Sequence, residues 1–263
     1  MSALTYKEMQ HVLMEDLRLY HFPIAVKYLF DDAQVEEFER NVDHFTPVKP
    51  MTFCQWEIAA RMKGQTVLGK PAGLGCPNAE YVFGWSEYSD KEVASHAKYT
   101  KDLDQAARFV KSKARLPEGA LKAIVVSPLA DAYFDPDTVH FYCDNMQAYH
   151  LAVDYMAAMD IHPLRTNITM NSSACAGNVW SYSEKSANML PACSGSYNAG
   201  KTERGEVNFI IPGEHIGPTV QRLLDRKAQY GSGAITRPGD GFPGADVCKN
   251  CPLIIFKKAE KKA

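Results

Sequence analysis

The sequence predicts a mixed α/β (α+β) fold that forms a single compact unit. Stretches rich in branched and aromatic residues, typical of strands, alternate with stretches that have helical periodicity. A chain of 263 residues, of which 46% are hydrophobic, can bury a sizeable core. We therefore expect one domain over residues 1–256. A repeated cysteine pattern, described below, suggests two pseudo-symmetric halves, each with a small sheet flanked by helices.

Local signals mark the first elements. Thr5 and Glu8 have the spacing of a capping box, so a helix should begin near Thr5. Pro23 precedes residues 24–30, which are branched and aromatic and predict a strand. A short acidic helix is expected at 33–40.

Further strands and helices follow the same periodicity. A helix is predicted from Asp144 to Asp160, and its stripe of Met146, Tyr149, Val153 and Met156 is expected to face the core. A last helix should start at Gly217-Pro218 and end at Gly231. The remaining strands are predicted at 66–68, 123–127, 139–142, 167–170, 207–211 and 253–256.

Composition predicts the character of the last segments of the chain, and the repeated cysteine pattern divides the rest into halves. Residues 231–246 are rich in Gly and Pro and should form an ordered loop or a flap, and residues 257–263 should be a flexible basic tail. The expected halves span about residues 1–100 and 101–230.

Charge and hydropathy argue against several partners. A formal net charge of −2 gives no long-range field that would hold nucleic acid or an anionic membrane surface. No stretch is long and apolar enough to span a bilayer, and the first ten residues lack a basic region followed by an apolar run. We therefore expect a cytoplasmic protein that binds neither nucleic acid nor membranes.

The chain has seven cysteines, and two of them are predicted in the first turn of a helix. Thr52 and Gln55 form a capping box around Cys54. Ser173 is expected to cap a helix whose second residue is Cys175. Unpaired backbone N–H groups at such positions favour a thiolate and any anionic group that it holds.

Each of these cysteines is followed, about one helix later, by a cysteine among small residues. Cys76 lies in a Gly-rich turn, and Pro77 makes it a predicted helix cap. Cys193 precedes Ser194-Gly195 in a similar turn, where backbone amides can approach a ligand closely. The order of helix cap, cysteine, helix, small-residue turn and second cysteine therefore occurs twice. This suggests duplicated halves with four thiols meeting between them.

Four thiolates match the needs of a [4Fe–4S] cluster or, alternatively, a structural zinc ion. Widely spaced cysteines favour the cluster, since zinc ribbons usually carry tight Cys-x-x-Cys pairs. The competing interpretation is that Cys54, Cys76, Cys175 and Cys193 are buried thiols packed as small hydrophobic residues. Cys248 and Cys251 form a Cys-x-x-Cys pair that could add metal ligands or act as a redox dithiol, whereas Cys143 is expected only to be buried.

From about Thr5 to Gly231, the chain resembles the DUF169 family of archaeal and bacterial proteins. The resemblance depends on Cys54 with its helix, the Leu74-Gly75-Cys76 turn, Cys175, and the Cys193-Ser194-Gly195 turn that leads to Val207–Pro212 and its helix. The family is common in anaerobes, and its recurring cysteines imply an oxygen-sensitive metal centre. Members often carry an arginine shortly after the last of these cysteines, where this chain has Tyr197-Asn198. The resemblance does not include Cys248 and Cys251.

The leading hypothesis is a cluster-binding protein that transfers electrons, senses redox state or delivers a cluster, with a redox protein as partner. One alternative is a metal- or thiol-dependent enzyme that acts on a small molecule, and another is a zinc-stabilised binding module. No phosphate loop, dinucleotide fingerprint or nucleophile elbow is evident. A homodimer is the common default for such a chain, although the internal pairing would allow a functional monomer.

Overall fold

The computed structural model describes residues 4–230. Its centre is a six-stranded sheet in the order β2-β3-β1-β4-β6-β5, with every neighbouring pair antiparallel. The strands are β1 (Ile24–Leu29), β2 (Val67–Gly69), β3 (Ala123–Pro128), β4 (Thr138–Cys143), β5 (Asn188–Pro191) and β6 (Val207–Pro212). The predicted mixed α/β class is confirmed, but the two small sheets that we expected are one continuous sheet.

The strand order repeats about the central pair β1 and β4. In the first set β1 is innermost, β3 is next and β2 is at the edge, and in the second set β4, β6 and β5 take the same places. The first set comes from residues 24–128 and the second from 138–212. The predicted division at about residue 100 falls inside the first set, between β2 and β3.

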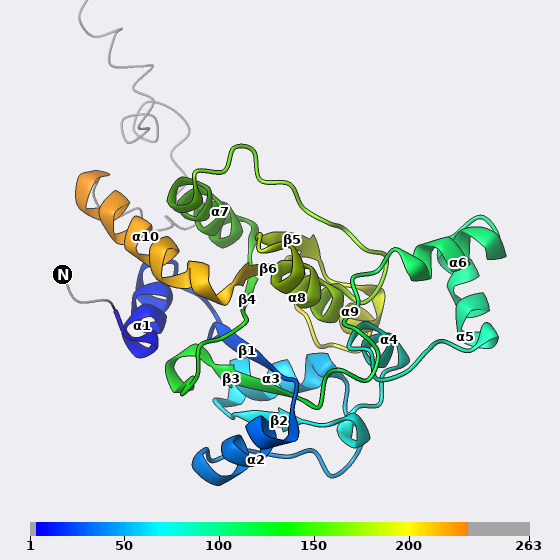
Figure 1. Ribbon diagram of the computed structural model, residues 1–263. Helices are drawn as coiled ribbons and strands as arrows, with labels where there is room; N and C mark the ends of the chain where they lie inside the picture. The colour runs from blue at the N-terminus through cyan, green and yellow to red at the C-terminus, as the bar shows by residue number, and fades with distance from the viewer. Residues whose placement is uncertain (1–3, 231–263) are drawn as a thin grey trace, which may run out of the picture.

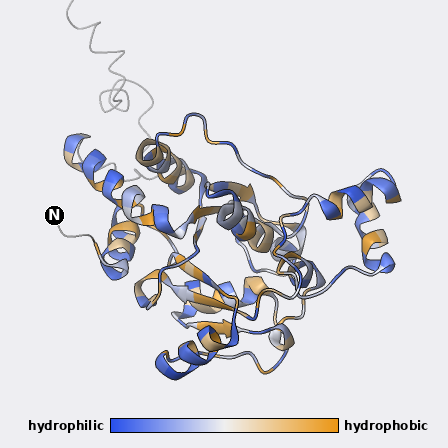
Figure 2. Cartoon of the chain, viewed as in Figure 1, coloured by the Kyte–Doolittle hydropathy of each residue, from blue (hydrophilic) through white to orange (hydrophobic). Residues whose placement is uncertain are grey.

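Helices cover both faces of the sheet (Figure 1). On one face, α3 (Phe53–Lys63) and α8 (Ser173–Glu184) pack with α4 (Pro77–Val82) against the residues of β1 that point to their side, such as Val26. On the other face, α1 (Tyr6–Asp16), α7 (Asn145–Met159) and α10 (Ile216–Tyr230) pack against alternate residues such as Ala25. Many strand residues are coloured as hydrophobic in Figure 2, as expected for a sheet that is buried on both faces.

The remaining helices lie at the margins of the sheet. α2 (Asp32–Asn41) packs beside β1, and α9 (Ser194–Asn198) lies between β5 and β6 in the chain. α5 (Asp90–Ser95) and α6 (Leu103–Lys111) form a separate pair that projects from the body in Figure 1. Among the described residues, no helix is long and apolar enough to cross a membrane.

Most local predictions are confirmed. The capping boxes at Thr5 and Thr52 are both present, and Cys76 is the N-cap of α4 with Pro77 as its first residue. Cys143 is fully buried at the end of β4. The last helix begins at Ile216, close to the predicted Gly217-Pro218 start.

Three local predictions are wrong. Residues 167–170 form no strand, and the edge strand is β5, which the sequence analysis did not identify. The N-cap of α8 is Ser172 rather than Ser173, so Cys175 is its third residue. In α7, Met146 and Tyr149 are exposed and the opposite face is buried, because apolar residues occur around most of this helix and its sequence marks no single core face.

The close packing of α8 on the sheet depends on Gly177. A Cβ atom at this position would lie 2.7 Å from Cδ1 of Ile210 on β6. The missing side chain therefore lets the helix approach the strand and sets the depth at which Cys175, two residues earlier, lies. The predicted strand at 253–256, the segment 231–246 and the tail 257–263 lie outside the described residues.

Candidate metal centre

The four predicted cysteines line one pocket of about 390 Å3, although up to 139 positions separate them in the sequence. Cys54 lies in the first turn of α3 and Cys175 in the first turn of α8. Cys76 is the N-cap of α4, and Cys193 is the N-cap of α9. All four thiols therefore enter the pocket from the start of a helix. Cys248 and Cys251 lie outside the described residues.

The thiols are close enough to influence one another electrostatically. Burial raises the pKa of Cys175 well above its ordinary value, and the neighbouring Cys76, Cys54 and Cys193 raise it further. Burial likewise raises the pKa of Cys54, and Glu57 and Cys193 add to the effect. Without a bound cation or metal, the site therefore keeps these two thiols protonated.

Cys193 differs from Cys54 and Cys175 because its pKa is lowered rather than raised. Burial opposes ionisation of Cys193, but hydrogen bonds from the backbone N–H groups of Ser173, Ser196 and Ser172 outweigh it and lower the pKa. The N–H of Cys193 in turn donates to Oγ of Ser173 at 2.8 Å. This bond connects the start of α9 to the start of α8.

The chain turns sharply where it enters α8. Ser172 has φ of +65°, in the left-handed region that non-glycine residues rarely adopt. Its carbonyl oxygen accepts a hydrogen bond from Sγ of Cys175 at 3.4 Å. Backbone strain of this kind is found preferentially at functional sites.

A buried lysine lies beside the thiols, and the sequence analysis did not identify it. Lys113 is only 5% exposed and forms no ion pair with any carboxylate in the described part of the chain. Its Nζ donates to the hydroxyl of Tyr88 at 2.9 Å and to Oδ1 of Asn78 at 3.3 Å. Burial lowers its pKa to about 8, whereas Cys175, Cys76 and Cys193 act in the opposite direction. A buried cation without a counter-ion favours an anionic occupant nearby.

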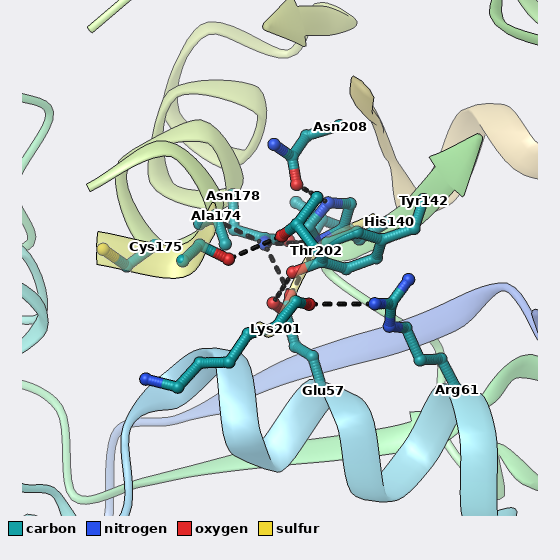
Figure 3. Close-up of polar contacts among 12 residues, drawn as sticks. Glu57, Arg61, His140, Tyr142, Ala174, Cys175, Asn178, Lys201, Thr202 and Asn208 are labelled. Carbon is teal, nitrogen blue, oxygen red and sulfur yellow. Dashed lines mark hydrogen bonds and ion pairs between the residues drawn. The ribbon is translucent and has the colours of Figure 1, made fainter. Parts of the chain in front are cut away.

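A cluster of buried polar side chains, formed by Glu57, His140 and Tyr142, lies between α3 and β4 (Figure 3). Oε1 of Glu57 lies 2.6 Å from Nδ1 of His140, and its Oε2 accepts the hydroxyl of Tyr142 at 2.6 Å. Glu57 and His140 are fully buried. Figure 3 shows Glu57 and Arg61 extending from the same side of α3 toward β4.

Hydrogen bonds on both ring nitrogens fix the orientation of His140. Asn208 donates from Nδ2 to the carbonyl oxygen of Leu190, so its Oδ1 faces Nε2 of His140 at 2.9 Å. Nε2 of His140 therefore donates to Oδ1 of Asn208, and Nδ1 faces Glu57. Each polar atom of the buried ring thus has a partner, which reduces the free-energy cost of burying it.

Among residues 4–230, no group of three or more His, Cys, Asp and Glu side chains is close enough together to hold a single metal ion.

Comparison with protein families identifies a family for most of the chain. The model of the DUF169 family, described as uncharacterised ArCR, matches residues 12–222. Comparisons with curated proteins and with solved structures give no significant match. The matched range includes the four cysteines of the pocket and Lys113, whereas Cys248 and Cys251 lie beyond it.

Proposed function

The chain belongs to the DUF169 family, and we propose that it binds a [4Fe–4S] cluster through Cys54, Cys76, Cys175 and Cys193. The observation that carries this proposal is that four thiols from distant parts of the chain line one pocket. With all four irons ligated, such a group suits electron transfer, redox sensing or delivery of the cluster to another protein. The partner in each case would be a redox protein.

The electrostatics of the pocket support an anionic occupant. A four-iron cluster with four thiolates carries net negative charge in its usual oxidised form, and burying it requires positive partners. Cys54 and Cys175 lie in the first turns of α3 and α8, where the positive end of the helix dipole favours negative charge. Lys113 adds a buried positive charge that has no carboxylate partner among the described residues. The residues present therefore fit an anionic group held by thiolates.

The test is anaerobic reconstitution of the full chain with iron and sulfide, followed by metal and sulfide analysis and a visible spectrum. We expect about four irons and four sulfides per chain, and loss of the visible absorption in each single Cys→Ser variant of the four pocket cysteines. Cys143→Ser is the matched control, because Cys143 is buried but does not line the pocket. A Cys248→Ser/Cys251→Ser variant tests whether the last pair is required.

Two outcomes would contradict the proposal. Stoichiometric zinc in colourless protein after anaerobic purification would favour the zinc-stabilised module. Retained absorption in any of the four pocket variants would remove that cysteine from the ligand set, and retained absorption in all four would end the proposal.

A further inference from the structure

The pocket extends beyond the thiols into a part whose ionisable side chains are basic. No Asp or Glu lines it, whereas Lys98, Lys201 and His96 do. The other outer residues offer hydroxyl or amide groups, namely Ser95, Tyr99, Ser194 and Asn198. The whole pocket, including the part lined by the thiols, has a volume of about 390 Å3, which is within the range of small-molecule sites.

The two lysines have no competing anionic partner in the described structure. Neither Lys98 nor Lys201 forms an ion pair with a described carboxylate. The backbone of Lys201 is held on both sides, since its N–H donates to the carbonyl oxygen of Ser196 at 2.9 Å and its own carbonyl oxygen accepts from Arg61 at 2.9 Å. The residue is therefore fixed at the wall of the pocket, while its ammonium group has no carboxylate to bind.

Hydroxyl groups lie at the same part of the pocket. The hydroxyl of Tyr99 lies 2.7 Å from Oγ of Ser194, and this hydrogen bond joins the segment after α5 to the first residue of α9. Both residues line the pocket. Hydroxyls held in this way can donate to an oxygen atom that the lysines attract.

We propose that this outer part binds a small dianion with oxygen acceptors, such as a dicarboxylate or an inorganic oxyanion, through Lys98 and Lys201. The proposal rests on the proposed function in one respect, because the group held by the thiols is taken to fill the inner part. The bound anion would then lie next to that group, as a substrate or as a ligand whose binding the metal centre senses.

The test uses isothermal titration calorimetry of the full chain, both metal-free and reconstituted, with malonate, phosphate and sulfate as probes. We expect at least one probe to bind, with an affinity that falls as ionic strength rises. Lys98→Met and Lys201→Met should each weaken that binding about tenfold or more, because each removes one charged contact. Lys91→Met is the matched control, since Lys91 is an exposed lysine on α5 that does not line the pocket.

The outcomes separate the two proposals. If iron loads as expected but no probe binds, or if both lysine variants bind like the control, the anion site is refuted and the metal centre stands. If a probe binds through the two lysines but no cysteine variant changes the metal content, the anion site stands and the metal centre fails. A comparison of malonate with phosphate and sulfate shows whether carboxylates or inorganic oxyanions are preferred.

Discussion

Asn178 donates a hydrogen bond from Nδ2 to Oε1 of Glu57 at 3.4 Å, although 121 positions separate the two residues. Each lies three residues after a pocket cysteine, Glu57 after Cys54 on α3 and Asn178 after Cys175 on α8. The two helices thus face each other with a thiol in the first turn and a polar residue one turn later. This pairing connects the thiol pocket to the buried Glu57–His140 pair.

Replacing Glu57 with Gln should destabilise the protein by about 3 kcal/mol or more, because it leaves buried His140 without its acidic partner. Urea unfolding measures the free-energy change. Glu36→Gln is the control, since Glu36 is exposed on α2 and should change stability by less than about 0.5 kcal/mol. The double variant Glu57→Gln/His140→Gln should lose less unfolding free energy than the sum of the losses in the two single variants. An additive result would show that the two side chains do not act as a pair.

Lys113→Met should have opposite effects in the metal-free and the loaded protein. Without a metal group the variant should be as stable as the wild type or more stable, because it removes a buried cation that has no counter-ion among the described residues. In the reconstituted protein the visible absorption should decay faster in air, since the anionic group loses its neighbouring positive charge. Lys111→Met is the control, at an exposed position on α6. Equal decay rates in the two variants would show that Lys113 does not stabilise the metal centre.

In the metal-free protein, Cys193 should react with iodoacetamide at lower pH than Cys54. The pKa of Cys193 is lowered by hydrogen bonds from Ser173, Ser196 and Ser172 despite burial, whereas burial raises the pKa of Cys54. The thiolate is the reactive form, so the alkylation rate of Cys193 should reach half its maximum at the lower pH. Mass spectrometry of the labelled peptides measures both profiles. The reverse order of the two midpoints would show that the hydrogen bonds do not stabilise the Cys193 thiolate.

Glu206 should contribute to stability at neutral pH and lose that contribution in acid. Burial opposes its ionisation, but hydrogen bonds from His21 and the N–H of Glu203, with the charge of Arg61, lower its pKa to about 2. Because the folded-state pKa lies below the unfolded value of about 4.3, the contribution is complete above the unfolded value and disappears as pH falls toward about 2. The shift corresponds to about 3 kcal/mol.

The measurement is the difference in unfolding free energy between the wild type and Glu206→Gln at pH 7 and at pH 3. The wild type should lose about 2 kcal/mol of its advantage over this interval. A difference that stays constant with pH would mean that Glu206 has similar pKa values in the folded and unfolded states.

The sequence by itself determined the local features of the site. The capping box at Thr52 and Gln55 and the proline after Cys76 specify helix starts through neighbours only a few residues away, and both are present as predicted. Glu57 and Arg61 lie three and seven residues after Cys54, a spacing that places all three on one face of the predicted helix. For the same reason the central strands were predictable, since their apolar runs mark them locally.

The tertiary structure alone decided what meets in the pocket. β1 lies between β3 and β4, and this order places α3 and α8 on one face with their first turns at the same pocket. Lys113, Lys98 and Lys201 carry no sequence motif, and only packing brings them near the thiols. The edge strand β5 was missed because its four residues have no clear strand pattern of their own. It forms a strand because it pairs with β6. Local interactions therefore placed each cysteine at a helix start, whereas long-range strand pairing placed the four helix starts around one pocket.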